Sequence, residues 1–156
     1  QLYDILKYRI TYKGYARSVW AMISLNTRKP ADLLALHGGS IVDYVCDEPC
    51  PIEKPSRIKV TSTEPASSLN AKYSDIDING HVNSIRYIEH ILDLFPIELY
   101  KESRIRRFEM AYVAESYYGD ELTFYKDYVG NGTYDIEVRK NGGEAVCRSK
   151  VIFVEK

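Results

Sequence analysis

A single amphipathic helix, set in a chain otherwise patterned for strands, constrains the fold of this sequence most. Between Val82 and Phe95 the apolar residues recur at steps of three and four, which places them in one stripe along a helix. Pro96 follows directly, at a point where helices tend to end. A helix with one apolar stripe has to bury that stripe against another element. The stripe comprises Val82, Ile85, Ile88, Ile91, Leu92 and Phe95.

The sequence after the helix predicts four antiparallel strands that supply this partner. Residues 106–114 alternate, with Phe108, Met110 and Tyr112 on one face. Three further strands follow a turn at Gly119-Asp120, and two glycine-rich hairpins join them, at residues 130–132 and 141–143. A strand at 56–60 and a polar loop at 61–70 precede the helix. The predicted fold class is α+β, with one long helix packed on a curved antiparallel sheet, which is the hot-dog arrangement.

The N-terminal third is less regular. Residues 8–12 and 18–23 are rich in strand formers, and Ala31–Leu36 predicts a short helical turn that stops at His37-Gly38-Gly39. Residues 47–55 carry three prolines and four charges, which is typical of a linker. We therefore expect an N-terminal region at 1–46, a Pro-rich linker at 47–55 and a complete domain at 56–156.

The composition limits the classes of binding partner that we expect. A net charge of −1 and a pI of about 6.4 argue against nucleic acid or anionic lipid. No uncharged apolar run approaches the ~20 residues of a membrane helix. Three cysteines are too few for a disulfide scaffold, which favours a cytoplasmic location. Cys46 and Cys50 lack a second pair or a histidine, so neither a metal site nor a cofactor is expected.

The polar segment at residues 73–84, which leads into the helix, carries the most chemistry. His81 can exchange a proton, Asn79 can bind a carbonyl, and a helix N-terminus offers N–H groups to an oxyanion. The same residue types also serve as caps and turn formers, which is the default interpretation for Asp77 or Asn83 taken singly. The pattern alone leaves a catalytic and a structural role equally open.

Two motifs resemble the acyl-acyl carrier protein thioesterases of plants and bacteria. The first is Asp75-Ile76-Asp77-Ile78-Asn79-Gly80-His81-Val82-Asn83, continuing into Arg86-Tyr87-Ile88. The second, Ala16 to Met22 followed by Asn26 to Lys29, is similar to the last strand of the family's first hot-dog repeat. The resemblance implies hydrolysis of the thioester that joins a fatty acyl chain to the phosphopantetheine arm of acyl carrier protein.

The same resemblance implies the catalytic residues Asp77, Asn79, His81 and Glu115. Plant members carry a cysteine beside that glutamate, where this chain has Ser116, so a thiolate mechanism through that position is excluded. We expect direct attack by water. Glu115 would act as general base, alone or with His81, while Asn79 and the helix N–H groups hold the carbonyl and Asp77 orients Asn79 or His81.

Further positions are candidates for binding. Asn83 and Ser116 lie next to the catalytic residues and are predicted to contact substrate. A basic cluster after the helix is by default a solvated face, and the sharper hypothesis is docking of acidic acyl carrier protein. The cluster comprises Lys101, Arg104, Arg106 and Arg107. The alternatives are hydrolysis of acyl-CoA, another hot-dog reaction such as dehydration of hydroxyacyl groups, and a non-catalytic acyl-binding module.

Members of this family usually hold two hot-dog repeats. The resemblance matches residues 56–156 to a complete second repeat and residues 1–46 to part of the first. An unpaired strand and an open sheet edge favour self-association, because free N–H and C=O groups can pair with another chain. We therefore expect a homo-oligomer.

Overall fold

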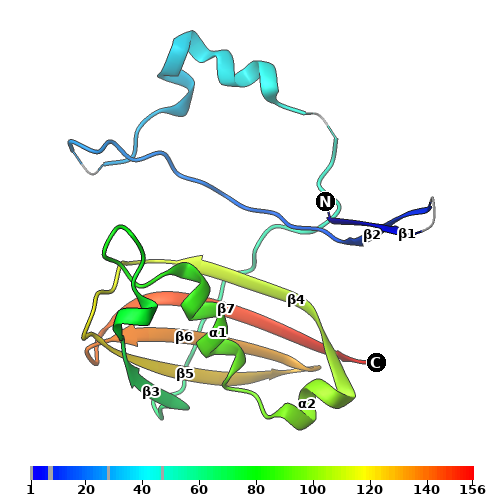
Figure 1. Cartoon of the computed structure of the whole chain (residues 1–156), viewed down its shortest axis with the longest axis vertical. Coiled ribbons are helices and arrows are strands. Elements are labelled where there is room, and N and C mark those ends of the chain that lie inside the picture. Colours follow the sequence, from blue (N-terminus) through cyan, green and yellow to red (C-terminus); the bar gives the residue numbers. More distant parts are fainter. Residues whose placement is uncertain (1, 7–8, 28, 47) are drawn as a thin grey trace. The chain divides into compact units, whose positions relative to one another are not determined.

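The structure is a computed structural model that describes the chain except residues 1, 7, 8, 28 and 47 (Figure 1). The side chains of residues 2–6, 9–12, 36 and 37 also lie outside the description. The chain divides into two compact units, residues 1–55 and residues 56–156. No helix in the described part of the chain is both long enough and apolar enough to cross a membrane.

The larger unit is built on a five-stranded antiparallel sheet with the strand order β3-β5-β6-β7-β4. The strands are β3 (Ser67–Asn70), β4 (Ser103–Tyr112), β5 (Glu121–Gly130), β6 (Thr133–Lys140) and β7 (Glu144–Glu155). Both predicted hairpins are confirmed, since Asn131 and Asn141 each sit at a φ of 49° between neighbouring strands. Such left-handed residues match the twist of tight hairpins. The four strands predicted after the helix are all present.

The helix α1 (Ser84–Leu92) lies across one face of this sheet, which we call the inner face (Figure 1). Tyr87 and Ile91 are buried there among the apolar side chains of β5, β6 and β7. Val82 belongs to the same core but precedes the helix, because its N–H donates to the Ser116 carbonyl at 2.8 Å. A second, short helix that the sequence did not predict, α2 (Ile97–Glu102), follows Pro96. The apolar stripe is confirmed as core at Val82, Ile91 and Phe95, whereas Ile85 is exposed.

The opposite, outer face of the sheet carries ion pairs. Glu137 on β6 contacts both Arg139 and Arg148, and Lys150 on β7 contacts Asp135 at 2.6 Å. Residues 56–66, which we call the strap, cross this face. The Ser56 N–H and hydroxyl donate to Glu109 on β4, and the Thr61 N–H and hydroxyl donate to Asp127 on β5.

The strap and the strand that follows it account for two wrong predictions. Residues 56–60 form no strand, because their anchoring hydrogen bonds go to side-chain carboxylates and not to a neighbouring backbone. The expected polar loop at 61–70 ends in β3, because the edge of β5 offers Ser67–Asn70 a complete antiparallel register. Neither outcome can be predicted from local sequence, because both depend on groups of the sheet: the carboxylates on its outer face and the backbone edge of β5.

The smaller unit contains a hairpin of β1 (Leu2–Leu6) and β2 (Arg9–Gly14) and a 3-10 helix, η1 (Leu33–Tyr44). The expected strand at 8–12 corresponds to β2, with Tyr8 outside the described residues. The strand expected at 18–23 is wrong, because this segment forms only an isolated bridge between Ile23 and Pro30.

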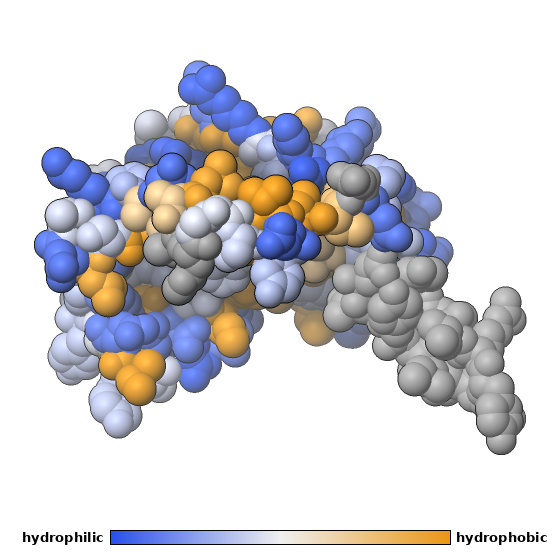
Figure 2. All heavy atoms as spheres, turned by 90° about the horizontal axis from the view of Figure 1, so that it is seen from above, coloured by the Kyte–Doolittle hydropathy of each residue, from blue (hydrophilic) through white to orange (hydrophobic). Residues whose placement is uncertain are grey.

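The short helical turn expected at Ala31–Leu36 is longer than predicted, since η1 runs through the two glycines at 38 and 39. The side chain of His37, expected in a turn, is outside the described residues. Apolar side chains of η1 are exposed at the surface, and Figure 2 shows apolar side chains on the face seen from above. The exposed apolar side chains of η1 include Leu33, Leu34, Ile41 and Val42.

Candidate active site

The loop before α1 is shaped by one carboxylate. Oδ1 of Asp77 accepts the N–H of Asn79 at 2.8 Å and the N–H of His81 at 3.2 Å. The Asp77 N–H in turn donates to the His81 carbonyl at 2.8 Å, and Gly80 turns the chain with a φ of 81°. Asp77 therefore orients both Asn79 and His81 through their backbone.

This loop meets the connection between β4 and β5 at one end of the sheet (Figure 1). An isolated bridge pairs His81 with Tyr117, next to the hydrogen bond from Val82 to Ser116. As a result, His81 Nε2 lies 3.5 Å from Glu115 Oε2, although 34 positions separate the two residues in sequence. The side chains are 28% and 45% exposed, so both are open to solvent and to a ligand.

Two residues that were not predicted from the sequence hold Glu115. The Tyr117 hydroxyl donates to Glu115 Oε2 at 3.1 Å. Lys140 on β6 donates from Nζ to the Glu115 carbonyl at 2.8 Å, and its hydrogen bond to Glu144 raises the pKa of its ammonium. The i, i+2 spacing of Glu115 and Tyr117 was a usable signal, because such residues share a side of extended chain. No local pattern could reveal Lys140, which depends on the register of β6.

Asn79 and Asn83 have different surroundings. Asn79 is exposed, and its side-chain amide forms no hydrogen bond with any residue that the structure describes. Asn83 is the N-cap of α1, where its Oδ1 accepts the Ile85 N–H at 3.0 Å. The cap occupies one of the helix N–H groups that were expected to hold an oxyanion. The geometry therefore leaves Asn79 as the freer donor.

Ser116 lies beside Glu115 but faces the core. It is 1% exposed, and its hydroxyl hydrogen-bonds the hydroxyl of Tyr87 on α1. Burial raises the pKa of the Tyr87 hydroxyl, so this is a hydrogen bond between neutral groups. The position does not support the predicted contact with substrate. The nearby core thiol of Cys147 is also unsuited to thiolate chemistry, because burial raises its pKa to about 12.

Exposed apolar side chains lie a few positions along the chain from His81 and Glu115. Ile78 lies in the loop that carries Asn79, and Ile85 is on the first turn of α1. Tyr112 ends β4, and its hydroxyl donates to the Ser84 carbonyl at 3.1 Å. All three are at least half exposed, at 101%, 57% and 51%. Apolar surface around polar, reactive groups is typical of sites that bind apolar ligands.

Arg107 has different surroundings from the other three residues of the basic cluster. Lys101, Arg104 and Arg106 are exposed around the start of β4, whereas Arg107 points to the outer face and contacts Glu109. Three of the four residues thus remain candidates for docking.

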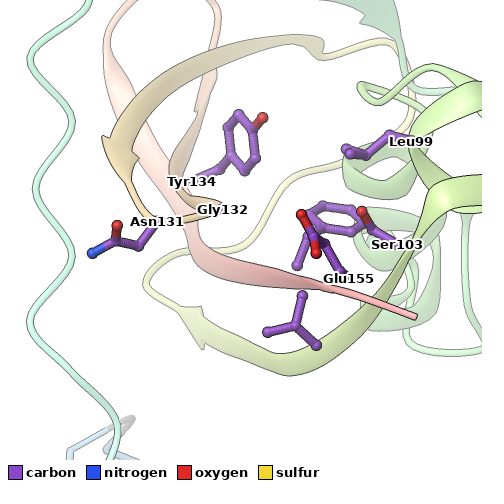
Figure 3. A pocket seen from close by; sticks show the side chains of 8 residues that line it. Leu99, Ser103, Asn131, Gly132, Tyr134 and Glu155 are labelled. Atoms are coloured by element: carbon purple, nitrogen blue, oxygen red, sulfur yellow. The ribbon is translucent and has the colours of Figure 1, made fainter.

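A separate pocket of about 460 Å³ lies at the far end of β4, away from His81 and Glu115 (Figure 3). Leu99, Ser103 and Tyr134 line it, and none of the predicted catalytic residues does. In the described part of the chain, no group of three His, Cys, Asp or Glu side chains is placed to hold a metal ion.

The larger unit, with α1 across an antiparallel sheet and a polar site beside the start of the helix, has the α+β hot-dog fold. The family model of the acyl-ACP thioesterase C-terminal domain matches residues 58–155. The chain therefore belongs to the acyl-ACP thioesterase family, as the two motifs predicted.

Solved structures agree with this assignment. An acyl-ACP thioesterase from Bacteroides thetaiotaomicron is 76% identical with a TM-score of 0.79, and the match covers 85% of this chain and 53% of that one. The 12:0-ACP thioesterase from Umbellularia californica, at 18% identity and a TM-score of 0.68, shares the fold over 86% of this chain and 53% of its own.

Among curated proteins, the chloroplastic dodecanoyl-[acyl-carrier-protein] hydrolase of Cinnamomum camphora is 27% identical over 103 residues. The match covers 63% of this chain and 27% of that protein. The chain thus spans about half the length of the similar structures and about a quarter of this curated relative.

Proposed function

We propose that this protein hydrolyses the thioester of fatty acyl-acyl carrier protein and releases the free fatty acid. The observation that carries the proposal is the 3.5 Å approach of His81 to Glu115, beside Asn79, in a chain of this family. Proteins with matching sequence are named for hydrolysis of acyl carrier protein thioesters.

The reaction begins with a water molecule beside Glu115 and His81. The water oxygen attacks the thioester carbonyl carbon, and its proton passes to the Glu115 carboxylate, directly or through the His81 imidazole. The tetrahedral intermediate then collapses, the C–S bond breaks, and the phosphopantetheine sulfur takes up the proton. No covalent acyl-enzyme forms, which is consistent with the buried position of Ser116.

Stabilisation of the oxyanion falls to Asn79 in this scheme. Its exposed amide can donate to the carbonyl oxygen as negative charge develops there. Asp77 supports this role indirectly, since it fixes the backbone of the loop that presents Asn79 and His81. The apolar side chains around the pair provide contact surface for the start of a fatty acyl chain.

Docking of acyl carrier protein is assigned to Lys101, Arg104 and Arg106. These residues lie near one end of β4 and Glu115 lies beyond the other, and ten strand residues span about 33 Å. The carrier protein would therefore have to lie along β4 to touch the basic residues and deliver its thioester. Arg107 is excluded from the proposed patch because Glu109 already pairs it.

Release of free thiol from acyl-acyl carrier proteins of increasing chain length tests the activity. We expect turnover in the wild type and a fall of at least 100-fold in His81→Ala. Parallel assays with acyl-CoA show whether the enzyme prefers acyl-acyl carrier protein or acyl-CoA as substrate. Binding of acyl carrier protein without any turnover would replace the proposal with a non-catalytic acyl-binding module.

The docking surface is tested with Arg104→Glu combined with Arg106→Glu. We expect a higher KM for acyl-acyl carrier protein and an unchanged KM for acyl-pantetheine, which lacks the acidic protein. The control is Arg57→Glu with Lys59→Glu, which reverses two exposed charges on the strap. Equal losses with both substrates would contradict docking at this patch.

Self-association is proposed through β4. This strand pairs with β7 on one side, and its other edge forms no ladder with any strand that the structure describes. Light scattering at micromolar concentration should show a species larger than one chain, and a clean monomer would refute this. The cytoplasmic location stays a prediction.

A further inference from the structure

Tyr117 contacts both members of the pair that carries the proposed chemistry. Its hydroxyl donates to Glu115 Oε2 at 3.1 Å. Its ring meets the His81 ring edge-on, with centroids 5.2 Å apart and an angle of 81° between the planes. One side chain therefore restrains a carboxylate through a hydrogen bond and an imidazole through ring packing.

The backbone of Tyr117 is itself anchored. It pairs with His81 in an isolated bridge, and its N–H donates to Asp120 Oδ2 at 2.8 Å. The Asn141 side chain donates to the other oxygen of Asp120, and these contacts lower the pKa of the Asp120 carboxyl, so it remains a charged acceptor. Tyr117 is thus held by the hairpin end of the sheet and can transmit that rigidity to the site.

Such a restraint matters because Glu115 is open to solvent. Its side chain is 45% exposed, and a long, exposed glutamate otherwise samples several rotamers. The 3.5 Å separation from His81 is longer than a good hydrogen bond, so the histidine alone fixes the carboxylate weakly. The Tyr117 hydroxyl contacts the same oxygen, Oε2, and so selects the rotamer that faces His81.

We propose that Tyr117 is a positioning residue of the site, whose hydroxyl fixes the Glu115 carboxylate and whose ring fixes the orientation of His81. This inference rests on the proposed thioester hydrolysis. The hydroxyl and the ring of Tyr117 have separate roles in this proposal, and two substitutions can distinguish them. Tyr117→Phe removes the hydroxyl and keeps the ring, and Tyr117→Ala removes both.

Kinetics of thiol release provide the first measurement. Tyr117→Phe should lower kcat about 10-fold with KM within twofold of wild type, because misplacement of a reacting group affects the chemical step more than binding. Tyr117→Ala should lower kcat further. Tyr118→Phe is the matched control, since Tyr118 is 71% exposed and has no hydrogen bond to the described residues. A kcat within twofold of wild type for Tyr117→Phe would overturn the proposal.

NMR of the free protein provides a measurement that does not depend on turnover. The Glu115 side-chain carboxyl carbon should shift in Tyr117→Phe, while the ring protons of His81 keep their positions. In Tyr117→Ala both sets of signals should shift, and in Tyr118→Phe neither should.

The two measurements separate the positioning proposal from the proposed function. Absence of thiol release from the wild type would refute the function, and the NMR spectra would then decide the positioning proposal alone. Carboxyl and imidazole signals that are unchanged in both Tyr117 variants would overturn it whatever the activity.

Discussion

Glu115 and Glu137 are the same kind of residue in the same unit, but their surroundings differ. The Glu137 side chain is 9% exposed and accepts hydrogen bonds from Arg139 Nε and Arg148 Nε, both at 2.7 Å. The Glu115 side chain is 45% exposed, and its carboxylate contacts the Tyr117 hydroxyl and the His81 imidazole. One carboxylate is enclosed by permanent cations, and the other is held by groups that can share or exchange a proton.

The difference shows that one unit places a stabilising carboxylate on the outer face of its sheet and a reactive one at the site. Burial alone would raise the pKa of Glu137, but hydrogen bonds and charge from Arg148 and Arg139 outweigh it and lower the pKa. The Glu137 carboxylate therefore stays ionised, and its ion pairs stabilise the sheet. Glu115 stands beyond the end of β4, where water and a ligand can reach it. The carboxylate of Glu137 on the outer face is therefore fixed in ion pairs, whereas the carboxylate of Glu115 in the site is accessible to water and ligand.

The largest expected effect is on turnover. Glu115→Gln keeps the size of the side chain but removes the base, and we expect the rate of thiol release to fall roughly 10²- to 10⁴-fold. The thermal midpoint should stay within a degree or so of wild type, because the side chain is half exposed and the change is nearly isosteric. Near-normal turnover would remove Glu115 from the mechanism.

The reverse pattern is expected for Glu137→Gln. The variant leaves the guanidinium groups of Arg139 and Arg148 without their charged acceptor, and we expect a loss of about 2 kcal/mol in the free energy of unfolding. Urea denaturation measures this loss. Activity per folded molecule should be unchanged, and a selective fall in kcat would mean that the outer face communicates with the site.

Sequence predicted the part of this comparison that is periodic or local. The alternation in β4 already placed Arg107 and Glu109 on the face opposite Phe108, and the structure confirms it. The hairpins followed from glycine and asparagine, whose left-handed conformations few other residues adopt. The motif from Asp75 to Asn83 is local as well, and it indicated the family that the match over residues 58–155 confirms.

Contacts set by register could not be predicted in the same way. Lys140 reaches the Glu115 carbonyl only because β6 pairs with β5 in one particular alignment. The strap was mistaken for a strand because its partners are carboxylates on other strands. The helix was expected to begin near Val82, but pairing with Ser116 delays it to Ser84. In each case a tertiary contact overrides a local preference.

Ser116 offers a smaller test beside Glu115. Ser116→Ala leaves the buried Tyr87 hydroxyl without its partner, and we expect a loss of about 1.5 kcal/mol in unfolding free energy with turnover nearly unchanged. Adding Tyr87→Phe should cost less than the sum of the two single changes, because the pair is then removed together. A large loss of kcat in Ser116→Ala would revive a covalent mechanism.

The smallest expected effect concerns Glu109, which links the strap to β4. Burial would raise the pKa of this carboxyl, but the Ser56 N–H and hydroxyl and the Arg107 guanidinium outweigh it and lower the pKa from its ordinary value of 4.5. A carboxyl with a lowered pKa in the folded state stabilises the protein above its unfolded pKa, and this contribution disappears as the pH falls through the folded value. Glu109→Gln should therefore cost about 1 kcal/mol at pH 7, since one guanidinium loses its charged partner.

The pH dependence of stability tests whether Glu109 acts through its charge. Urea denaturation between pH 7 and pH 3 should show that wild type and Glu109→Gln converge below pH 4.5, because protonation of Glu109 removes the same charge as the substitution. A constant gap between Glu109→Gln and wild type at every pH would mean that Glu109 acts through packing, and the contrast between fixed and available charge would then be confined to Glu137.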